Sequence, residues 1–246
     1  MAFEKLREQC IKNLMKDLKE SVNEDNLIIN AVNSIEELEK TGNMLVTRLR
    51  EWYALYNPEF EKWMRDNAKF ADLVIRKDRE TLLREIRYTE TMGADLSKRD
   101  LDAILMLAKQ AKSNYDMIYD LKDYIEGVMR KHCPNILEIA GVMLAAKLLA
   151  KSGSLKRLST FPASTIQILG AEKALFRHLK TGAKPPRHGI LVQHPLVAQA
   201  KQKDHGKRAR TLADKLSIAS RVDYFKGKFI GDKLKKELEN KFEVKF

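Results

Sequence analysis

The sequence contains few cysteines and no long apolar run. Its 246 residues include only two cysteines, Cys10 and Cys133, which are far apart and have neither CxxC nor CxxH spacing. This excludes a disulfide framework and a zinc knuckle, and it favours a reducing compartment. No apolar stretch reaches the about 20 residues of a membrane-spanning helix, and residues 1–20 contain no signal-peptide core. We therefore expect a protein of the cell interior with no membrane partner.

The short motifs of common enzymes are also missing. There is no G-x-G-x-x-G loop after a strand, no P-loop, no G-x-S-x-G and no H-E-x-x-H. The C-terminal segment GKFIGDK has glycines and a lysine, but it lacks the spacing and the Ser/Thr of a P-loop. We predict no catalytic residue, no metal site and no cofactor. An enzyme remains the rival class.

Excess positive charge is missing from one half of the chain. The formal net charge is +12, with 46 Lys and Arg against 34 Asp and Glu. Residues 1–133 hold 23 basic and 25 acidic residues, whereas residues 134–246 hold 23 basic and only 9 acidic ones. Because the surplus of +14 lies entirely in the second half, that half is predicted to bind an anionic partner, most simply a nucleic acid.

The first half has a helical composition, with few glycines and Pro58 as its single proline. Residues 3–20 show an amphipathic helical spacing. A heptad-like seam follows from Asn26, with one irregular step between Ile35 and Leu38. Its apolar positions are Ile28, Val32, Ile35, Leu38, Leu45, Leu49, Trp52 and Tyr56.

Asn57–Pro58 is predicted to end this helix, and a second helix is expected from about Glu59. It should carry Phe60, Trp63, Phe70 and Leu73. Ser97 is a candidate N-cap for a third helix, which repeats the seam up to Ile125. Matching seams on either side of a turn region predict a long antiparallel coiled-coil hairpin, with an ordinary helical bundle as the alternative. A hairpin leaves one stripe uncovered, so we expect a homodimer formed through the third helix, at Ile104, Ala108, Ala111, Tyr115 and Ile118.

The second half begins with a strongly apolar segment. Pro134 suits the first position of a helix, and residues 136–150 are apolar on nearly all sides until Ser152–Gly153 closes the segment. We expect one buried central helix here, at the middle of a compact helical domain.

A short basic helix is predicted between Gly170 and Gly182. Lys173, Arg177 and Lys180 share one face, and the backbone N–H groups that follow Gly170 and Ala171 offer an anion site at the helix N-terminus. Glu172 falls on the opposite, apolar side, where it suits either contact with a partner or a local cap. A solvated charged face is the plainer alternative.

Further cations flank this helix and extend the predicted surface. The loop after Gly182 adds Lys184, Arg187 and His188, and His178 is placed where it could stack on a nucleotide. A later helix begins with Lys207, Arg208 and Arg210, which oppose its dipole unless an anion lies nearby. We interpret these segments as one composite RNA-binding surface.

The stretch from Pro134 to Gly182 resembles the signature of the Nop domain family. PASTIQILGAEKALFRHLKTG and the later HGILVQHPLV are the most diagnostic segments, and RLREWY and NPE in the first half resemble that family's coiled coil. The resemblance covers residues 20–230 and is best with the archaeal box C/D members. It adds Gln167, within the motif, to the predicted binding residues.

The resemblance implies an RNA-binding scaffold rather than an enzyme. Members of the family bind a box C/D guide RNA whose kink-turn is held by a small ribosomal-protein-like subunit, and they dimerise through the coiled coil. Fibrillarin, bound by a separate N-terminal domain, performs the 2′-O-methylation; we expect that domain to be absent from this chain, which begins just ahead of the coiled coil. The rivals within this reading are a spliceosomal Nop-domain factor and a protein scaffold that binds no RNA.

The resemblance also divides the chain into four parts. Residues 1–25 are predicted to be an N-terminal linker helix and residues 26–133 a coiled-coil dimerisation domain. Residues 134–231 correspond to the basic Nop domain, and residues 232–246 form a short basic tail, which favours an archaeal origin. The predicted fold class is therefore all-α.

Overall fold

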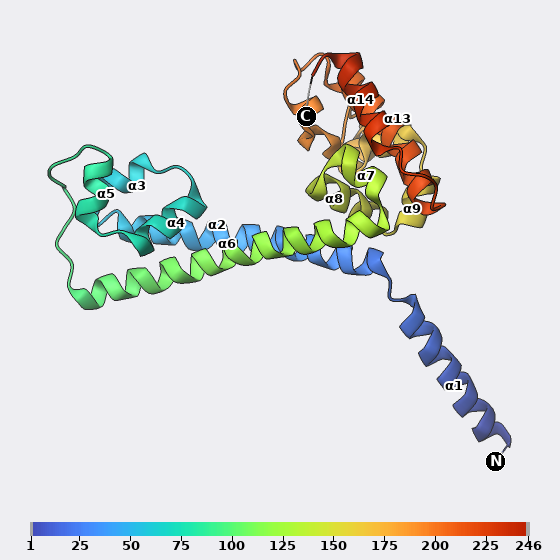
Figure 1. The fold of residues 1–246 in the computed structure, drawn as a ribbon, viewed down its shortest axis with the longest axis horizontal. Helices are drawn as coiled ribbons and strands as arrows, with labels where there is room; N and C mark the ends of the chain where they lie inside the picture. Colours follow the sequence, from blue (N-terminus) through green and yellow to red (C-terminus); the bar gives the residue numbers. More distant parts are fainter. Residues whose placement is uncertain (1, 245–246) are drawn as a thin grey trace. The chain divides into compact units, whose positions relative to one another are not determined.

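The computed structural model describes residues 2–244, and within them the regular secondary structure is all helical, with no strand, as the sequence predicts. The fourteen α-helices and one 3-10 helix of this described part fall into two compact units. The first unit consists of the chain up to Asn33 together with Tyr124 onward, and the second consists of Ser34–Asp123. Figure 1 shows the order of the helices.

The first six helices cover the near-neutral half of the sequence. They are α1 (Ala2–Ser21), α2 (Glu24–Tyr53), α3 (Pro58–Trp63), α4 (Asn67–Arg76), α5 (Arg79–Glu85) and α6 (Lys98–His132). The basic half contains α7 (Pro134–Ala140), α8 (Val142–Ser152), α9 (Leu155–Thr160), α10 (Ala163–Ile168), α11 (Glu172–Thr181), the 3-10 helix η1 (Ile190–Gln193), α12 (Pro195–Ala198), α13 (His205–Tyr224) and α14 (Gly231–Phe242).

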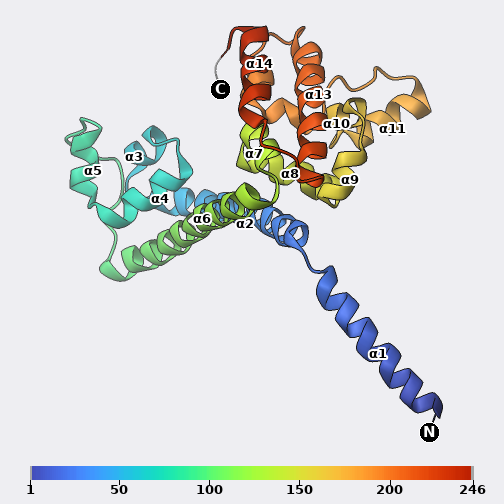
Figure 2. The ribbon, with the colours of Figure 1, turned by 45° about the vertical axis from the view of Figure 1, so that its right-hand side comes forward.

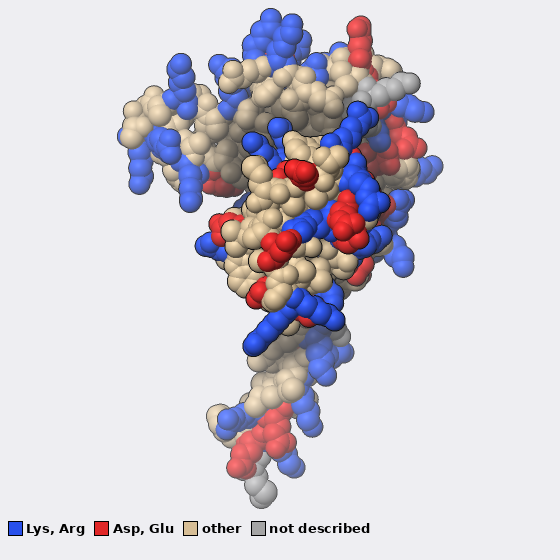
Figure 3. All heavy atoms as spheres, turned by 90° about the vertical axis from the view of Figure 1, so that its left-hand side faces the viewer, with Lys and Arg blue, Asp and Glu red and all other residues tan. Residues whose placement is uncertain are grey.

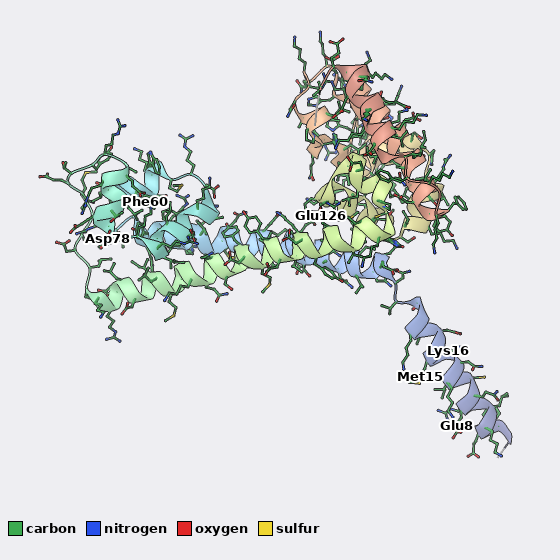
Figure 4. All side chains as sticks on the ribbon, viewed as in Figure 1. Glu8, Met15, Lys16, Phe60, Asp78 and Glu126 are labelled. Atoms are coloured by element: carbon green, nitrogen blue, oxygen red, sulfur yellow. The ribbon has the colours of Figure 1, made fainter. Side chains whose placement is uncertain are left out.

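Helix α1 is the amphipathic helix that the spacing of residues 3–20 predicts. Its apolar side chains are nevertheless exposed, including Phe3, Leu14 and Met15, the last of which is labelled with Lys16 in Figure 4. None of the helices within residues 2–244 combines the length and the apolarity that crossing a bilayer requires.

Helices α2 and α6 run antiparallel, which confirms the direction of the predicted hairpin (Figure 1). In the second unit, the Asn114 side-chain amide donates to the Leu38 carbonyl at 2.8 Å. Tyr115 of α6 bonds Asn43 of α2 at 3.4 Å, whereas Lys122, later in α6, lies 3.8 Å from Glu39, earlier in α2. Ser97 caps the start of α6 by accepting from the Asp100 N–H at 3.3 Å, as predicted.

The seam of α2 differs from the predicted one after Ile35. Gly42, Val46 and Tyr53 are buried, whereas Trp52 is 50% exposed. The heptad therefore continues without an irregular step, and a glycine occupies one of its inward positions. Apolar periodicity alone missed this position because glycine carries no apolar side chain to count.

The five residues predicted for dimerisation are used within the single chain. Ile104, Ala108, Ala111 and Ile118 are buried, and Tyr115 is half-buried against the same core. An apolar seam is satisfied equally well by an intrachain partner. Dimerisation stays a prediction, and a second copy would meet the exposed residues beside this seam.

The segment after Pro58 forms three short helices instead of the one predicted helix. Asn57 caps α3, Asp66 caps α4 and Asp78 caps α5, each by accepting a backbone N–H. These caps divide the segment because each satisfies the N–H groups of a new helix start. Phe60, labelled in Figure 4, is fully buried in the core that the three helices share.

In the first unit, the apolar segment 134–152 also differs from the expected single helix. It breaks at Gly141, which has φ 71° and separates α7 from α8. The expected burial is confirmed, since Ile136, Ala145 and Leu149 are fully buried. Helix α13 packs against α7, α9 and α10.

The carboxylate of Asp223, near the end of α13, joins three of these helices. It accepts from the backbone N–H groups of Asn135 at 3.1 Å and Ile136 at 2.9 Å, in the first turn of α7. The Asn135 side-chain amide donates to it at 2.7 Å, while the Asn135 side-chain oxygen accepts from Ile230, just before α14, at 2.6 Å. Burial raises the pKa of Asp223, and the three hydrogen bonds act in the opposite direction.

The segment predicted as a tail contains α14, which packs on α7. Leu234 and Leu238 are buried, and Lys235 forms an ion pair with Glu138 of α7 at 2.8 Å. The structure thus gives residues 231–242 a place in the helical core of the first unit.

Asp25 fastens the start of α2 within the same unit. Its carboxylate lies 2.7 Å from the His132 ring at the end of α6, and it accepts from the Leu155 N–H at 3.0 Å. The hydrogen bond to Asp25 raises the pKa of His132, with Glu24 and Asp223 acting in the same direction.

We predict that alanine has opposite effects at two helical glycines. A Cβ at Gly42 would lie 2.6 Å from the Asn114 side-chain nitrogen, so Gly42→Ala should break the bond to Leu38. An unpaired amide there costs about 1–3 kcal/mol, which outweighs the about 0.5–1 kcal/mol gained by alanine in a helix, so stability should fall by about 1 kcal/mol. A Cβ at Gly127 meets nothing within 4 Å, so Gly127→Ala should raise stability by about 0.5–1 kcal/mol. Urea denaturation of both variants checks this, and a stabilised Gly42→Ala variant would contradict the described packing.

We also predict a pH dependence that His132 causes. Because its folded pKa is raised above the ordinary value of about 6.5, its stabilising contribution is complete below that pH. The contribution is lost as the pH rises through the raised folded pKa. Thermal unfolding between pH 6 and 8.5 should therefore show a larger fall in Tm for the wild-type chain than for His132→Gln. If Tm falls equally with pH in the two proteins, His132 is not the cause of the pH dependence.

Candidate nucleic-acid interface

Helix α11 displays both of its faces to solvent. It ends at Gly182, as predicted, and none of its side chains is buried. Phe176 is 60% exposed and Leu179 69% exposed, while the predicted cations Lys173, Arg177 and Lys180 are exposed as well. In Figure 2 the helix lies at the margin of the first unit's C-terminal helices. The helix therefore carries an available cationic face and an available apolar face.

The base of α11 is fixed by close contact between two distant segments, each of which contains a glycine. The Gly189 N–H donates to the Gln167 carbonyl at 2.8 Å, and the Ile190 N–H donates to the Leu169 carbonyl at 2.9 Å. A Cβ at Gly189 would lie 1.9 Å from the Leu169 carbonyl oxygen, and one at Gly170 would lie 2.4 Å from the Ile190 side chain. The two diagnostic segments of the sequence thus meet here, and only glycine permits the approach.

Glu172 acts as a local cap at the start of α11. Its carboxylate accepts from the Gly170 N–H at 2.7 Å. This local bond agrees with the local role that the sequence offers, and contact of the exposed Glu172 with a partner stays a prediction. Ala171, the N-cap residue, makes no side-chain cap bond.

Two predicted binding residues hold the following loop in place. Gln167 is buried, and its side-chain amide donates to the Arg187 carbonyl at 2.6 Å. His178 is half-buried, with a ring nitrogen hydrogen-bonded to the Ala183 carbonyl. Gln167 therefore positions the loop, and its predicted role in binding stays a prediction. Lys184 lies between the two anchored residues, Ala183 and Arg187, and is exposed.

Beyond this loop, the structure forms a basic hollow of about 510 Å³. Its cationic lining comprises the predicted Arg187, Lys207 and Arg210, together with Lys241 of α14. Gln167, Pro185, Pro186, Gly206 and Thr211 complete the lining. No carboxylate of the described residues lines the hollow, so its potential is positive and suited to a phosphate.

Lys241 could not be assigned from the sequence, because its segment was expected to be a tail. Its ammonium group lies 3.4 Å from the Thr211 hydroxyl of α13. Only the packing of α14 brings it beside Lys207 and Arg210. A basic residue at helical spacing from Leu234 and Leu238 was the one available signal.

Arg208 differs from its predicted neighbours. Its guanidinium donates to the Leu196 carbonyl at 3.0 Å and lies 5.2 Å from the centre of the Phe242 ring. These contacts give Arg208, which is half-buried, a structural role, and its predicted contact with RNA stays a prediction. His188 is half-buried, with its ring centre 5.5 Å from that of His205.

Lys and Arg side chains outnumber acidic ones around the C-terminal helices (Figure 3, upper part). Of the fourteen residues predicted to bind RNA or a partner, the exposed cations of α11, the loop and α13 are available for an anion. Gln167, Glu172, His178 and Arg208 make hydrogen bonds within the chain that support this surface, and their own part in binding stays a prediction.

An all-α architecture that displays a basic helix beside a basic hollow defines a helical protein suited to nucleic acid. The chain belongs to the Nop family, described as "snoRNA binding domain, fibrillarin", which it matches over residues 34–244.

Several relatives share this similarity. The chain is 39% identical to an uncharacterized NOP5 family protein of Methanocaldococcus jannaschii, over 89% of this chain and 56% of the relative. It is 36% identical to nucleolar protein 58 of Schizosaccharomyces pombe, over 81% of this chain and 42% of the relative. The chain thus spans about half the length of these relatives.

A solved structure is also similar. A chain in the crystal structure of a fibrillarin/Nop5p complex matches with a TM-score of 0.58 and 27% sequence identity. The match covers 98% of this chain and 78% of that one. It supports the all-α fold and family membership described above.

The glycine contact generates a prediction about the loop. Gly189→Ala would force its Cβ against the Leu169 carbonyl, so the two backbone bonds between the segments should break. We expect faster proteolysis within residues 183–188 and a loss of about 2 kcal/mol or more in stability. Gly182→Ala, where a Cβ meets nothing within 4 Å, is the control for backbone strain alone and should cost about 1 kcal/mol. Equal proteolysis of the two variants would contradict the role of the contact.

Proposed function

We propose that the chain is a non-catalytic, RNA-binding scaffold subunit of an archaeal box C/D guide ribonucleoprotein that directs 2′-O-methylation. Family membership and the relatives named NOP5 and nucleolar protein 58 support this class of function. The single observation that carries the RNA-binding part is the continuity of α11, the anchored loop and the basic hollow within one unit.

The proposed ligand is a kink-turn RNA already held by a small ribosomal-protein-like subunit. The cationic side of α11 suits the phosphates of the RNA, because Lys173, Arg177 and Lys180 are exposed and share a face. Phe176 and Leu179 on the other side suit an apolar patch of a protein partner. A helix with two free faces of different chemistry is well adapted to a joint RNA–protein surface.

Other parts of the proposal concern assembly. The region 26–133 would serve as the dimerisation domain and the region 134–231 as the Nop domain. Since the predicted seam of α6 is buried within the chain, a homodimer would use exposed residues of α2 or α6, such as Met44 or Met106. Fibrillarin would supply the methyltransferase activity in such a particle, inside the archaeal cell.

Titration of kink-turn RNA, with and without the small kink-turn protein, tests the proposal. We predict at least tenfold tighter binding when that protein is present, equivalent to about 1.4 kcal/mol of coupling. Lys173→Ala combined with Arg177→Ala should weaken binding to the RNA–protein complex and reduce the log–log salt dependence by about two units, one for each lost phosphate contact.

The matched control removes two exposed cations elsewhere, by Lys62→Ala with Arg65→Ala in the second unit. This variant should retain the wild-type affinity and salt dependence. Equal affinity for naked and protein-bound RNA would leave only a nonspecific basic domain. If the chain binds the small protein but neither RNA form, it is a protein scaffold.

A further inference from the structure

The turn between α13 and α14 has an unusual composition for an exposed segment. Residues 224–230 read YFKGKFI, so that two lysines lie between the aromatic residues Phe225 and Phe229. Phe225 is 75% exposed and Phe229 51% exposed. Tyr224 extends the aromatic surface, since its ring meets that of Phe225 edge to face with the centres 5.0 Å apart. Such a concentration of exposed aromatic surface indicates a binding site.

The charge of this turn is positive. Lys226 and Lys228 are both exposed. Of the carboxylates near the turn in sequence or in space, Asp223 is buried and hydrogen-bonded to α7, and Glu138 forms an ion pair with Lys235. Asp232 is exposed in the first turn of α14. The segment between Asp223 and Asp232 therefore carries two cations and no acid.

The backbone of the turn is held at both ends. Phe225, Lys226 and Gly227 donate to the carbonyls of Arg221, Asp223 and Val222 at 3.0, 3.2 and 2.8 Å, which closes the end of α13. Lys226 takes the left-handed conformation, with φ 52°, that glycine usually occupies at this position. At the other end, the Ile230 N–H is bonded to the buried Asn135. The turn is thus preorganised, which lowers the entropy lost on binding.

We propose that this turn is a binding site for single-stranded RNA. Unpaired bases stack on the rings of Phe225 and Phe229, and Lys226 and Lys228 contact the phosphates between them. Four residues of chain span at most about 14 Å, a distance that a few nucleotides of one strand can cover. A phenyl ring offers stacking without hydrogen bonds, so the site accepts any base sequence.

The composition favours RNA over a protein partner. Lysine is depleted in the centres of protein–protein interfaces, whereas here each exposed ring has a lysine next to it or one residue away. Exposed rings combined with neighbouring cations are the chemistry that binds single strands. The site involves neither α11 nor the basic hollow, and it does not depend on kink-turn recognition.

The test uses the full chain and a fluorescently labelled octamer of uridine, which has no kink-turn. Phe225→Ala and Phe229→Ala should each weaken binding about tenfold, in the range of one lost base stack. Phe225→Leu should lose as much as Phe225→Ala, because leucine retains apolar surface but cannot stack. Phe225→Trp should restore wild-type affinity. If leucine restores binding as well as tryptophan does, the site prefers apolar contact and the RNA proposal is overturned.

Two controls separate this site from the rest of the protein. Tyr88→Ala removes a similarly exposed ring, 53% exposed, from the second unit and should leave binding of the octamer unchanged. Lys226→Ala with Lys228→Ala should reduce the log–log salt dependence by about 1.4, or 0.7 for each contact with a single strand, whereas Lys233→Ala with Lys236→Ala on α14 should not.

The outcomes distinguish this proposal from the proposed function. If the octamer does not bind, or if the Phe225 and Phe229 variants bind it as the wild type does, the turn is not an RNA site, whatever the result with kink-turn RNA. If the wild type binds the octamer through the turn but ignores kink-turn RNA, this site stands and the proposed function fails. Unchanged Tm values of the Phe225 and Phe229 variants show that the fold is intact.

Discussion

The buried carboxylate of Asp223 is the interaction on which the basic unit depends. It caps the start of α7 from the far end of α13, and through Asn135 it also fixes the chain that leads into α14. A buried carboxylate is costly unless its hydrogen bonds are satisfied, and here three N–H groups satisfy it. Because α14 supplies Lys241 to the basic hollow, the position of one buried acid controls a cationic surface of the same unit.

The surface cations of this unit are positioned by polar residues that are themselves buried or half-buried. Gln167 holds the carbonyl of Arg187, His194 accepts from the Leu196 N–H while its other ring nitrogen meets the Ile139 carbonyl, and the contact of Gly189 with Leu169 fixes the base of α11. Burial lowers the pKa of His194, which keeps the ring neutral and able to accept. Function at such a surface depends as much on these bonds as on the cations they position.

The two units use their cationic side chains differently. In the second unit, Arg50 accounts for part of the RLREWY motif: its guanidinium bonds the Met64 carbonyl at 2.7 Å, pairs with Glu61 at 3.0 Å and lies 4.4 Å from the centre of the Phe70 ring. Arg50 therefore stabilises the interior of this unit. In the first unit, most cations remain on the surface. The near-neutral residues 1–133 thus use charged side chains for packing, whereas the basic residues 134–246 display them on the surface.

The sequence by itself determined the helical class, the direction of the hairpin, the ends of α11 and the cationic face of that helix. These features depend on residues within one or two turns of each other, through periodicity, caps and helix-stopping glycines. Only the tertiary structure decided that Gly42 continues the seam, that the α6 seam is filled by the same chain, that Gln167 and Arg208 point inward and that Lys241 joins the hollow. Each of these depends on a contact between residues distant in the chain, and local spacing carries no information about which distant residue a side chain will meet.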